Sequence, residues 1–356
     1  MKSHKKQTIL DSLMRYATSL GYGQIHTKID KKTGLQAFVA IHSTTRGPAI
    51  GGCRCVPYHS AANALEDALR LGYMMSYKAA ISNLPHGGAK AVLMKPAEIK
   101  DRKAYFESYG DFVNELGGRY ITAVDSGTDA PDMDVVATRT SFVTCTSSGL
   151  DNDPSLVTAI GVKRGIEAAV KFKLNRASVE GIRVAIQGAG HVGYYLAKEM
   201  HALGAKIMMT DINPQLLKRC VEEFDAEICR PDEIYQVKAD VFAPCALGAV
   251  LNLSTIGALQ VSIVAGSANN QLAHYRYSSL LQERGILYAP DFLINAGGLI
   301  HVAAMYAHKT TEESHAQISN IYETAYDVFE RAAKENVDPN AIAIRIARER
   351  ITEPRP

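Results

Sequence analysis

A glycine-rich turn between a short apolar run and a helical pattern constrains the fold of this chain most. The run Ile182-Arg-Val-Ala-Ile186 leads into Gln187-Gly188-Ala-Gly190-His-Val-Gly193, after which apolar residues recur at helical spacing. A second short apolar run ends at Asp211, about 20 positions after Gly188. This order of strand, Gly-x-Gly-x-x-Gly turn, helix and acidic residue is typical of a dinucleotide-binding unit built on a parallel sheet.

The residues of this turn have separate predicted roles. Gly188 would make the tight turn, Gly190 would admit a pyrophosphate, and Gly193 would let the helix pack closely. Asp211 would bind the adenosine ribose hydroxyls and repel a 2′-phosphate, so we predict NAD rather than NADP. The alternative is a glycine-rich turn without a ligand. The predicted cofactor-binding residues of the turn are Gly188, Ala189, Gly190, His191, Val192 and Gly193.

The second half of the chain alternates between strand and helix patterns. A stretch rich in Ser, Thr, Gly, Asn and Asp at 140–155 is the best candidate for a linker, and a helix is expected from 154 to about 171. A strong amphipathic pattern at 318–332 predicts a core helix that crosses back to the first domain. Strands separated by helices predict a doubly wound parallel sheet, with strands at 181–187, 205–210, 240–243, 262–265 and 286–289.

The first half carries two lysines behind strand and helix patterns. Two strands at 22–29 and 35–42 are expected, followed by a helix that Ser60 caps. Lys78 would lie at the end of that helix, and Lys90 follows a Gly-Gly pair that we expect to let a ligand approach the backbone. Two ammonium groups in a cleft suit a carboxylate substrate. Each lowers the proton affinity of the other, so one of them could act as a base near neutral pH.

Length, charge and cysteine content narrow the class of protein. The 356 residues suffice for two domains, and a net charge of +2 gives no reason to expect nucleic acid or an acidic membrane as partner. The N-terminus lacks the apolar run of a signal peptide, and no segment approaches the ~20 apolar residues of a membrane span. The six cysteines form no disulfide framework, and Cys53-x-Cys55 lacks a second ligand pair, so no metal is expected. We predict a cytoplasmic, reducing location.

Several further motifs carry a resemblance to one family of enzymes. The chain resembles the amino-acid dehydrogenases related to glutamate dehydrogenase, and most of all the branch specific for leucine, valine, phenylalanine and tryptophan, with the leucine enzymes as the best match. The resemblance extends from Ala37 to the C-terminal helix. The motifs are Gly47-Pro-Ala-Ile-Gly-Gly52, Tyr77-Lys78, Gly87-Gly-Ala-Lys90, Thr122-Ala-Val-Asp125, Ala243-Pro-Cys-Ala-Leu-Gly248, Ala265-Gly-Ser-Ala-Asn-Asn270 and Asn295-Ala-Gly-Gly298.

The resemblance implies the catalytic roles. Lys78 would pair with the substrate α-carboxylate, and Lys90 would activate the water that attacks the imine left after hydride transfer. Asp125 would exchange protons with the amino group. A lysine can serve in this way only when its pKa is lowered, which burial and a second cation provide. The competing interpretations are surface lysines for Lys78 and Lys90 and a helix cap for Asp125.

The resemblance also implies contacts to cofactor and substrate amine. Thr158 would face the cofactor from the start of the helix that enters the nucleotide domain, with Cys245 and Ala246 lining the same cleft. Asn295 would contact the nicotinamide carboxamide. Asn269 is our choice for the contact to the substrate amine, while Asn270 and a purely structural turn asparagine remain as alternatives.

Position 50 separates the possible substrates. In the glutamate enzymes a lysine at the corresponding place binds the distal carboxylate, whereas this chain has Ile50, so glutamate should be rejected. An apolar pocket discriminates single methylenes by only ~1–3 kcal/mol, and leucine, isoleucine and valine should all react. Departures at Leu299, His301 and Ser126 leave an aromatic amino acid possible. The predicted substrate-binding residues are Lys78, Ile50, Gly51, Met75, Ala123, Asn269, Leu299 and Val302.

The sequence thus predicts a two-domain α/β enzyme. Residues 1–150, completed by 326–356, would form the catalytic and oligomerisation domain, and 151–325 the NAD-binding Rossmann domain, with hydride transfer in the cleft between them. The expected reaction converts an L-amino acid, NAD and water into the 2-oxo acid, ammonia and NADH. By resemblance the protein forms a homo-oligomer, often an octamer. The alternative from another class is a catalytically idle NAD-binding sensor.

Overall fold

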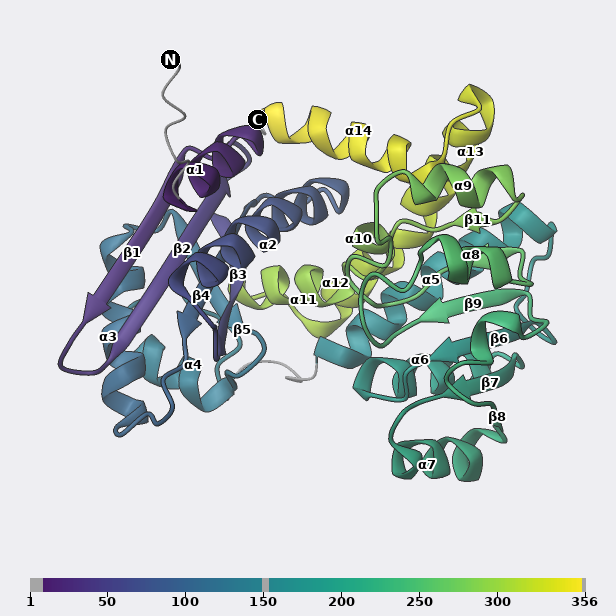
Figure 1. Ribbon diagram of the computed structural model, residues 1–356, viewed down its shortest axis with the longest axis horizontal. Helices are drawn as coiled ribbons and strands as arrows, with labels where there is room; N and C mark the ends of the chain where they lie inside the picture. The colour runs from purple at the N-terminus through teal and green to yellow at the C-terminus, as the bar shows by residue number, and fades with distance from the viewer. Residues whose placement is uncertain (1–8, 149–153, 354–356) are drawn as a thin grey trace, which may run out of the picture. The chain divides into compact units, whose positions relative to one another are not determined.

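The computed structural model describes residues 9–148 and 154–353, and its chain divides into two compact units (Figure 1). Of the described residues, the first unit takes 9–148, 302–309 and 348–353, and the second takes 154–301 and 310–347. In this part of the chain, no helix combines the length and the hydropathy that crossing a membrane requires. The two-domain α/β fold with parallel strands is as predicted.

A five-stranded sheet forms the centre of the first unit. Its order is β1-β2-β4-β3-β5, in which β3 runs parallel to both of its neighbours and β2 antiparallel to both of its own. The expected turn at 30–34 joins the first two strands, with Gly34 at a positive φ of 79°. The strands are β1 (Gln24–Asp30), β2 (Leu35–Ser43), β3 (Ala49–Val56), β4 (Gly87–Met94) and β5 (Tyr120–Val124).

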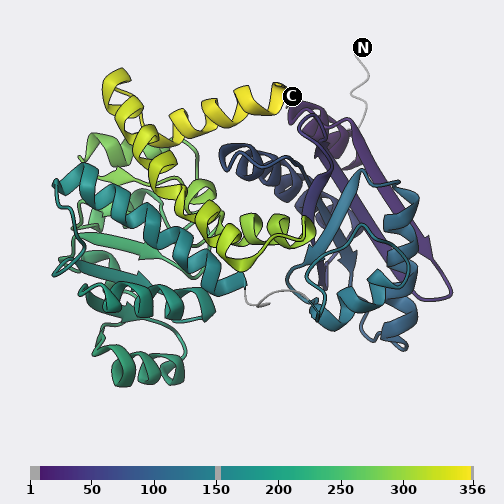
Figure 2. The same ribbon diagram turned by 180° about the vertical axis from the view of Figure 1, so that it is seen from behind.

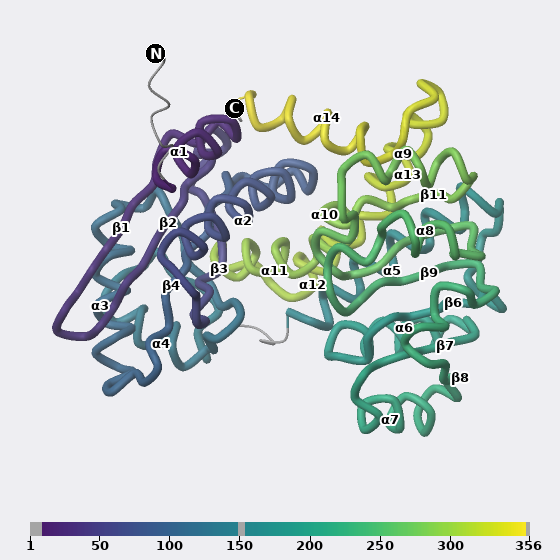
Figure 3. Tube along the Cα trace, in the orientation of Figure 1, coloured from purple at the N-terminus to yellow at the C-terminus, as the bar shows by residue number. Residues whose placement is uncertain are grey.

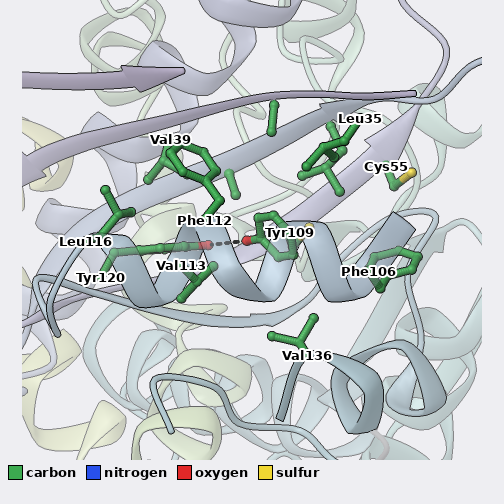
Figure 4. Packing of buried hydrophobic residues seen from close by; sticks show 14 of the residues in the cluster. Leu35, Val39, Cys55, Phe106, Tyr109, Phe112, Val113, Leu116, Tyr120 and Val136 are labelled. Carbon is green, nitrogen blue, oxygen red and sulfur yellow. Dashed lines mark hydrogen bonds between the residues drawn. The ribbon is translucent and has the colours of Figure 1, made fainter. Parts of the chain in front are cut away.

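Helices cover both faces of this sheet. Helices α1 (Ile9–Ser19) and α2 (Ala61–Ile81) pack on one face, while α3 (Arg102–Glu115) and α4 (Ala130–Ala137) pack on the other. Figure 4 shows the second layer, where large side chains of α3 lie between the helix and the strands. Tyr109 and Tyr120 are both buried there, with their hydroxyl oxygens 3.4 Å apart. This aromatic core fixes the strands whose ends carry the polar side chains described below.

Helix α2 packs against the sheet at a glycine of β4. Ser60 caps it as predicted, because its hydroxyl accepts a hydrogen bond from the Asn63 N–H. A Cβ on Gly88 would lie 2.0 Å from the Ser76 nitrogen of α2, and one on Gly87 would lie 1.7 Å from the Ser43 carbonyl oxygen. The expectation that the Gly-Gly pair admits a ligand was therefore wrong. The two glycines admit the chain's own backbone: Gly88 lets α2 pack against β4, and Gly87 lets the end of β2 approach β4.

The second unit contains a six-stranded parallel sheet in the order β11-β10-β9-β6-β7-β8. The tube in Figure 3 follows the strand–helix–strand path from β6 through α6 (His191–Ala202) to β7. The sequence missed only the two-residue β8 at the edge. The strands are β6 (Arg183–Gln187), β7 (Lys206–Thr210), β8 (Glu227–Ile228), β9 (Val241–Pro244), β10 (Ile263–Val264) and β11 (Leu287–Tyr288).

The second sheet is covered on both faces, as a doubly wound sheet requires. One face packs on α8, α9 and the 3-10 turn η1, whose apolar side chains form one cluster with the strands. Helices α5, α6 and α13 lie together on the other face (Figure 2). The remaining helices are α5 (Pro154–Leu174), α7 (Pro214–Phe224), η1 (Ile234–Gln236), α8 (Leu253–Ala258), α9 (Tyr277–Glu283), α10 (Asp291–Ile294), α11 (Gly297–Tyr306), α12 (Thr311–Ser319), α13 (Ile321–Glu335) and α14 (Pro339–Thr352).

The C-terminal part differs from the prediction that 326–356 complete the first domain. The amphipathic pattern does form the core helix α13, but it packs on α5 within the second unit. Phe329 meets Phe172 of α5, with ring centroids 5.7 Å apart. Of the described residues in this region, only 348–353 belong to the first unit. A sequence pattern identifies a buried helix face but not which core buries it.

Candidate functional site

An ion pair between the buried Lys90 and the half-buried Asp125 joins two of the predicted catalytic residues. Lys90 lies within β4, Asp125 directly follows β5, and the Lys90 Nζ contacts the Asp125 Oδ2. Strand β3 runs between those two strands and has Gly52 at this point, where a Cβ would lie 2.9 Å from the Asp125 Cβ. The missing side chain lets the two groups meet across β3. The competing interpretation of Asp125 as a helix cap is wrong, since Asp129 caps α4.

Arg54 extends this pair in a way the sequence analysis missed. Its Nη2 lies 3.5 Å from the Asp125 Oδ1, and its Nη1 lies 2.9 Å from the Asp67 Oδ2 on α2. Tyr58 donates a hydrogen bond of 2.7 Å to the same Asp67 oxygen. The available signal was an arginine in the otherwise apolar β3, directly after the Gly-Gly-Cys sequence. A charged residue in such a strand must be paired.

The environment of Lys90 changes its acidity. Burial lowers the pKa of Lys90 to about 7, and the positive charges of Arg54 and Lys78 act in the same direction. The Asp125 carboxylate favours the ammonium form and opposes them. Burial and a second cation were the predicted causes, but Arg54 contributes more than Lys78 does. Lys90 is thus a buried amine that can exchange its proton near neutral pH.

Lys78 lies in the last turn of α2 and is half-buried. The carbonyls that end this helix are held from the C-terminal segment, where Arg350 donates hydrogen bonds of 3.2 Å to Ala80 and 2.8 Å to Ile81. The position agrees with the prediction that Lys78 lies where the helix dipole favours a cation. The lysine is therefore carried by a helix whose end is fixed on the first unit.

The predicted substrate-binding residues divide between the two units. Ile50 and Ala123 are buried in the first unit, while Met75 and Val302 of the same unit are half-buried. Leu299 belongs to the second unit and is 8% exposed. Gly51 has a packing reason of its own, because a Cβ there would lie 1.8 Å from the Ala89 carbonyl oxygen.

The glycine-rich turn has the geometry expected at a phosphate site. Gly188 adopts a φ of 104°, and a Cβ on Gly193 would lie 2.0 Å from the Gly188 carbonyl oxygen. A Cβ on Gly190 would meet no heavy atom of the described chain within 4 Å. Gly190 is also the N-cap of α6 and provides no side-chain hydrogen bond to the first turn. The N–H groups that begin α6, including those near His191 and Val192, can therefore bind an anion.

Asp211 connects this turn to the next strand. Its carboxylate accepts hydrogen bonds of 2.7 Å from the Ala189 N–H and 2.8 Å from the Asn213 N–H. The turn lies at the carboxyl ends of the strands, beside the β6–β9 boundary where the strand order reverses. Ligands of open α/β sheets bind at such a point. Cys245 and Ala246 directly follow β9, and the Ala246 Cβ lies 2.9 Å from where a Gly188 Cβ would be.

A buried amide is the most specific feature of this region. The Asn295 side chain is 4% exposed and donates hydrogen bonds to the Ser267 carbonyl and the Asn269 Oδ1, at 3.1 and 3.0 Å. Its own Oδ1 is buried, with no hydrogen-bond partner among the described residues. Asn270 has a left-handed backbone with a φ of 53°, which fits its role in a turn. Thr158 lies half-buried in the first turns of α5, where its hydroxyl donates to the Pro154 carbonyl.

These observations fit a dinucleotide. The described residues offer helix N–H groups without a side-chain cap, open space beside Gly190, the acidic Asp211 and a buried Asn295 oxygen that has no donor among them. By contrast, no cluster of three metal-ligating side chains occurs within 9–148 and 154–353. Cys53 and Cys55 instead lie buried in the core under α3.

Comparisons with known proteins agree with this geometry. Residues 22–142 match the family model described as the dimerisation domain of Glu/Leu/Phe/Val dehydrogenase, and 149–218 and 210–355 match the Glutamate/Leucine/Phenylalanine/Valine dehydrogenase model. Leucine dehydrogenase of Thermoactinomyces intermedius is 46% identical over 338 residues, covering 94% of this chain and 92% of the relative. Valine dehydrogenase of Streptomyces coelicolor is 41% identical, with 94% of each covered. The crystal structure of L-tryptophan dehydrogenase from Nostoc punctiforme superposes with a TM-score of 0.83 at 38% identity, covering 95% of this chain and 98% of that one.

Proposed function

The chain belongs to the Glu/Leu/Phe/Val dehydrogenase family of amino-acid oxidoreductases, and on that premise we propose that it oxidises L-leucine, L-isoleucine and L-valine with NAD. The reaction consumes the amino acid, NAD and water, and it releases the 2-oxo acid, ammonia, NADH and a proton. The observation that carries the proposal is the buried Lys90–Asp125 pair, with Lys78 on the adjoining helix.

The three residues have complementary tasks. Lys78 pairs with the α-carboxylate of the substrate and so orients the amino group and Cα. Asp125 accepts a proton from the substrate ammonium, because an amine must lose its positive charge before hydride can leave the adjacent carbon. The oxidised substrate is an imine. Lys90, with its lowered pKa, takes a proton from the water that adds to the imine carbon, and Asp125 returns a proton to the departing ammonia.

NAD supplies the hydride acceptor when it is bound. The α6 N-terminus and Gly190 would hold its pyrophosphate, with Ala189, His191, Val192 and Gly193 completing the turn. Asp211 would accept hydrogen bonds from the adenosine ribose and exclude a 2′-phosphate. The Asn295 Oδ1 would accept a hydrogen bond from the carboxamide, which would satisfy its buried lone pairs. Thr158, Cys245 and Ala246 would line the same site.

The substrate preference follows from apolar side chains. Ile50 cannot pair with a distal carboxylate, and a buried unpaired charge costs several kcal/mol, so glutamate is rejected. We assign Met75, Ala123, Val302 and Leu299 as further apolar contacts of the substrate, and Gly51 as a contact through its backbone. We assign the contact with the substrate amine to Asn269.

Tryptophan or phenylalanine is the second candidate substrate. The favouring observation is the similarity to L-tryptophan dehydrogenase of Nostoc punctiforme, 39% identical over 340 residues. Leucine is preferred because the leucine dehydrogenase relative reaches 46%.

We also propose a division of roles between the two units, an oligomeric assembly and a cellular location. The first unit would bind the amino acid and make subunit contacts, and the second would bind NAD. We expect a homo-oligomer, with an octamer as the predicted size, located in the cytoplasm. Size-exclusion chromatography with light scattering would measure the mass of the assembly.

One experiment tests the activity and its alternatives together. A panel of L-amino acids is incubated with NAD and, separately, with NADP, and formation of the reduced cofactor is followed by absorbance. We expect leucine to give the highest kcat/KM with NAD. A higher value for tryptophan or phenylalanine would establish the second candidate. Tight NAD binding with no turnover of any amino acid would indicate an NAD-binding sensor instead.

A further inference from the structure

Arg54 occupies a position between the catalytic pair and the helix that carries Lys78. Its guanidinium binds two carboxylates, with Nη1 on Asp67 of α2 and Nη2 on Asp125 after β5. The two oxygens of Asp125 are therefore contacted from different strands. Oδ2 meets Lys90 of β4, and Oδ1 meets Arg54 of β3 and the Ser126 N–H at 2.5 Å.

Asp67 is itself fixed and can hold the guanidinium in place. Its Oδ2 accepts from Arg54 and Tyr58, and its Oδ1 lies 2.8 Å from the Arg70 Nη2. The Arg54 and Asp67 side chains are 24% and 16% exposed, so water screens their interaction less than at the surface. A planar guanidinium suits a site with two acceptors in different directions, which the single ammonium of a lysine cannot bridge in the same way.

We propose that Arg54 is a positioning residue for the amino-acid chemistry: anchored by Asp67, it holds the second oxygen of Asp125 and keeps this carboxylate ionised and aimed while Lys90 gives up its proton. The inference rests on the proposed function, in which Asp125 accepts the proton of the substrate ammonium. It assigns to Arg54 a role through Asp125 rather than a contact with the substrate.

The reason lies in the charge balance of the pair. When Lys90 is neutral, Asp125 has lost the counter-ion on its Oδ2 and would take up a proton more readily. A guanidinium group keeps its charge in proteins over this range of pH. It also disfavours the charged form of Lys90, in the same direction as burial. The positive charge of Arg54 thus favours an ionised Asp125 and a neutral Lys90, which are the two states that oxidation requires.

The groups that face the pair come from two elements, β3 and α2. Arg54 and Cys53 approach from β3, Lys78 and Asp67 from α2, and the pair itself joins β4 to the end of β5. Among the charges, Arg54 and Lys78 lower the pKa of Lys90, while Asp67 raises it. Removing Arg54 and removing Asp67 should therefore move the titration of Lys90 in opposite directions. A purely structural role would not produce opposite shifts.

The experiment measures kcat/KM for the preferred amino acid against pH in the full-length protein. On the acid side of the profile, kcat/KM rises with pH as Lys90 loses its proton, and we call this rise the acid limb. Arg54→Met should move the acid limb to higher pH by about one unit. It should also lower the maximum kcat/KM roughly ten- to a hundredfold, mostly through kcat. Arg54→Lys should keep the limb in place but lose about tenfold in kcat, because the bridge is lost. Asp67→Asn should move the limb down. Arg139→Gln, which removes a surface ion pair with Asp111, is the matched control and should leave the profile unchanged.

Two results would overturn the proposal. One is an Arg54→Met variant whose dependence of kcat/KM on pH matches the wild type, and the other is a shift of the acid limb in the same direction and by the same amount in Arg54→Met and Asp67→Asn. If Arg54→Met does not fold, Asp67→Asn and Arg54→Lys still test the opposite shift and the loss of the bridge. NAD affinity should stay unchanged in all variants, since Arg54 and the glycine turn lie on different units.

A direct measurement separates this inference from the proposed function. The acidity of Lys90 is followed by NMR after reductive methylation with isotopically labelled formaldehyde at different pH values, which requires no turnover. A higher Lys90 pKa in Arg54→Met than in the wild type supports the electrostatic role even if no amino acid is oxidised. Equal values would refute it. Failure of the wild type to oxidise any amino acid would instead refute the proposed function.

Discussion

The Lys90–Asp125 pair of the first unit and the glycine turn of the second differ in how far their groups are already occupied by other parts of the protein. In the pair, the side chains already have partners within the protein: Asp125 contacts Lys90, Arg54 and the Ser126 N–H. In the turn, a Cβ at Gly190 would have no heavy-atom neighbour within 4 Å, and α6 begins without a side-chain cap. Proton transfer needs groups held in advance, whereas anion binding needs groups left available.

The glycines make the same contrast within one residue type. A side chain at position 52 would collide with Asp125, and one at position 88 would collide with the backbone of α2. At Gly190, by contrast, no heavy atom of the described residues lies within 4 Å of where a Cβ would be. The first kind of glycine stabilises the fold, and the second serves a ligand. Substitutions should therefore affect stability in one place and binding in the other.

The largest effect is expected at the centre of the charged region. Lys90→Met preserves the volume but removes the amine, and we expect kcat to fall by at least about 10³, within the range of lost general acid–base catalysis. NAD affinity, measured by quenching of intrinsic tyrosine fluorescence or by calorimetry, should change less than about threefold. If NAD binding fell in parallel with turnover, Lys90 would be a structural residue.

The next effect is the response of the wild type to pH. Oxidation needs a neutral Lys90, whose pKa burial lowers to about 7, so kcat/KM should fall about tenfold per unit below that value. Above it, the rate should level off until another group titrates. A rate that is flat from pH 5 to about 8 would show that Lys90 is not the base. NAD binding, measured over the same range, is the control.

Much of this fold could be predicted, but the charged network could not. The strand–turn–helix pattern around Gly188 and the acidic Asp211 directly after β7 are local signals, and the structure contains them where expected. Arg54 and Asp67 lie 13 positions apart and meet only because α2 packs on the sheet. Likewise α13 shows its apolar face in the sequence, but tertiary packing decides that α5 covers it. The spacing of apolar residues predicts which face of a helix is buried. Which residues then meet depends on how the elements are arranged in the fold.

A pair of glycine substitutions in the turn tests the distinction between packing and binding. Gly190→Ala has an ordinary φ of −63° and open space for a methyl group, so its Tm should match the wild type. Its dissociation constant for NAD should rise about tenfold or more, because the methyl group would meet the pyrophosphate. Gly193→Ala places a Cβ 2.0 Å from a carbonyl oxygen and should lose about 1–3 kcal/mol of stability. Unchanged NAD affinity in Gly190→Ala would contradict the assignment.

The smallest effect concerns the choice between NAD and NADP. Asp211 holds the turn through the Ala189 N–H and, in our proposal, also repels a 2′-phosphate. Asp211→Asn keeps an acceptor oxygen for that N–H but removes the charge, whereas Asp211→Ala removes both. Asp211→Asn should therefore change NAD affinity less than about threefold while improving NADP binding by about tenfold, and Asp211→Ala should weaken both cofactors. Equal discrimination in Asp211→Asn and the wild type would mean that the carboxylate only fastens the turn, and cofactor choice would then have to come from other residues around the ribose.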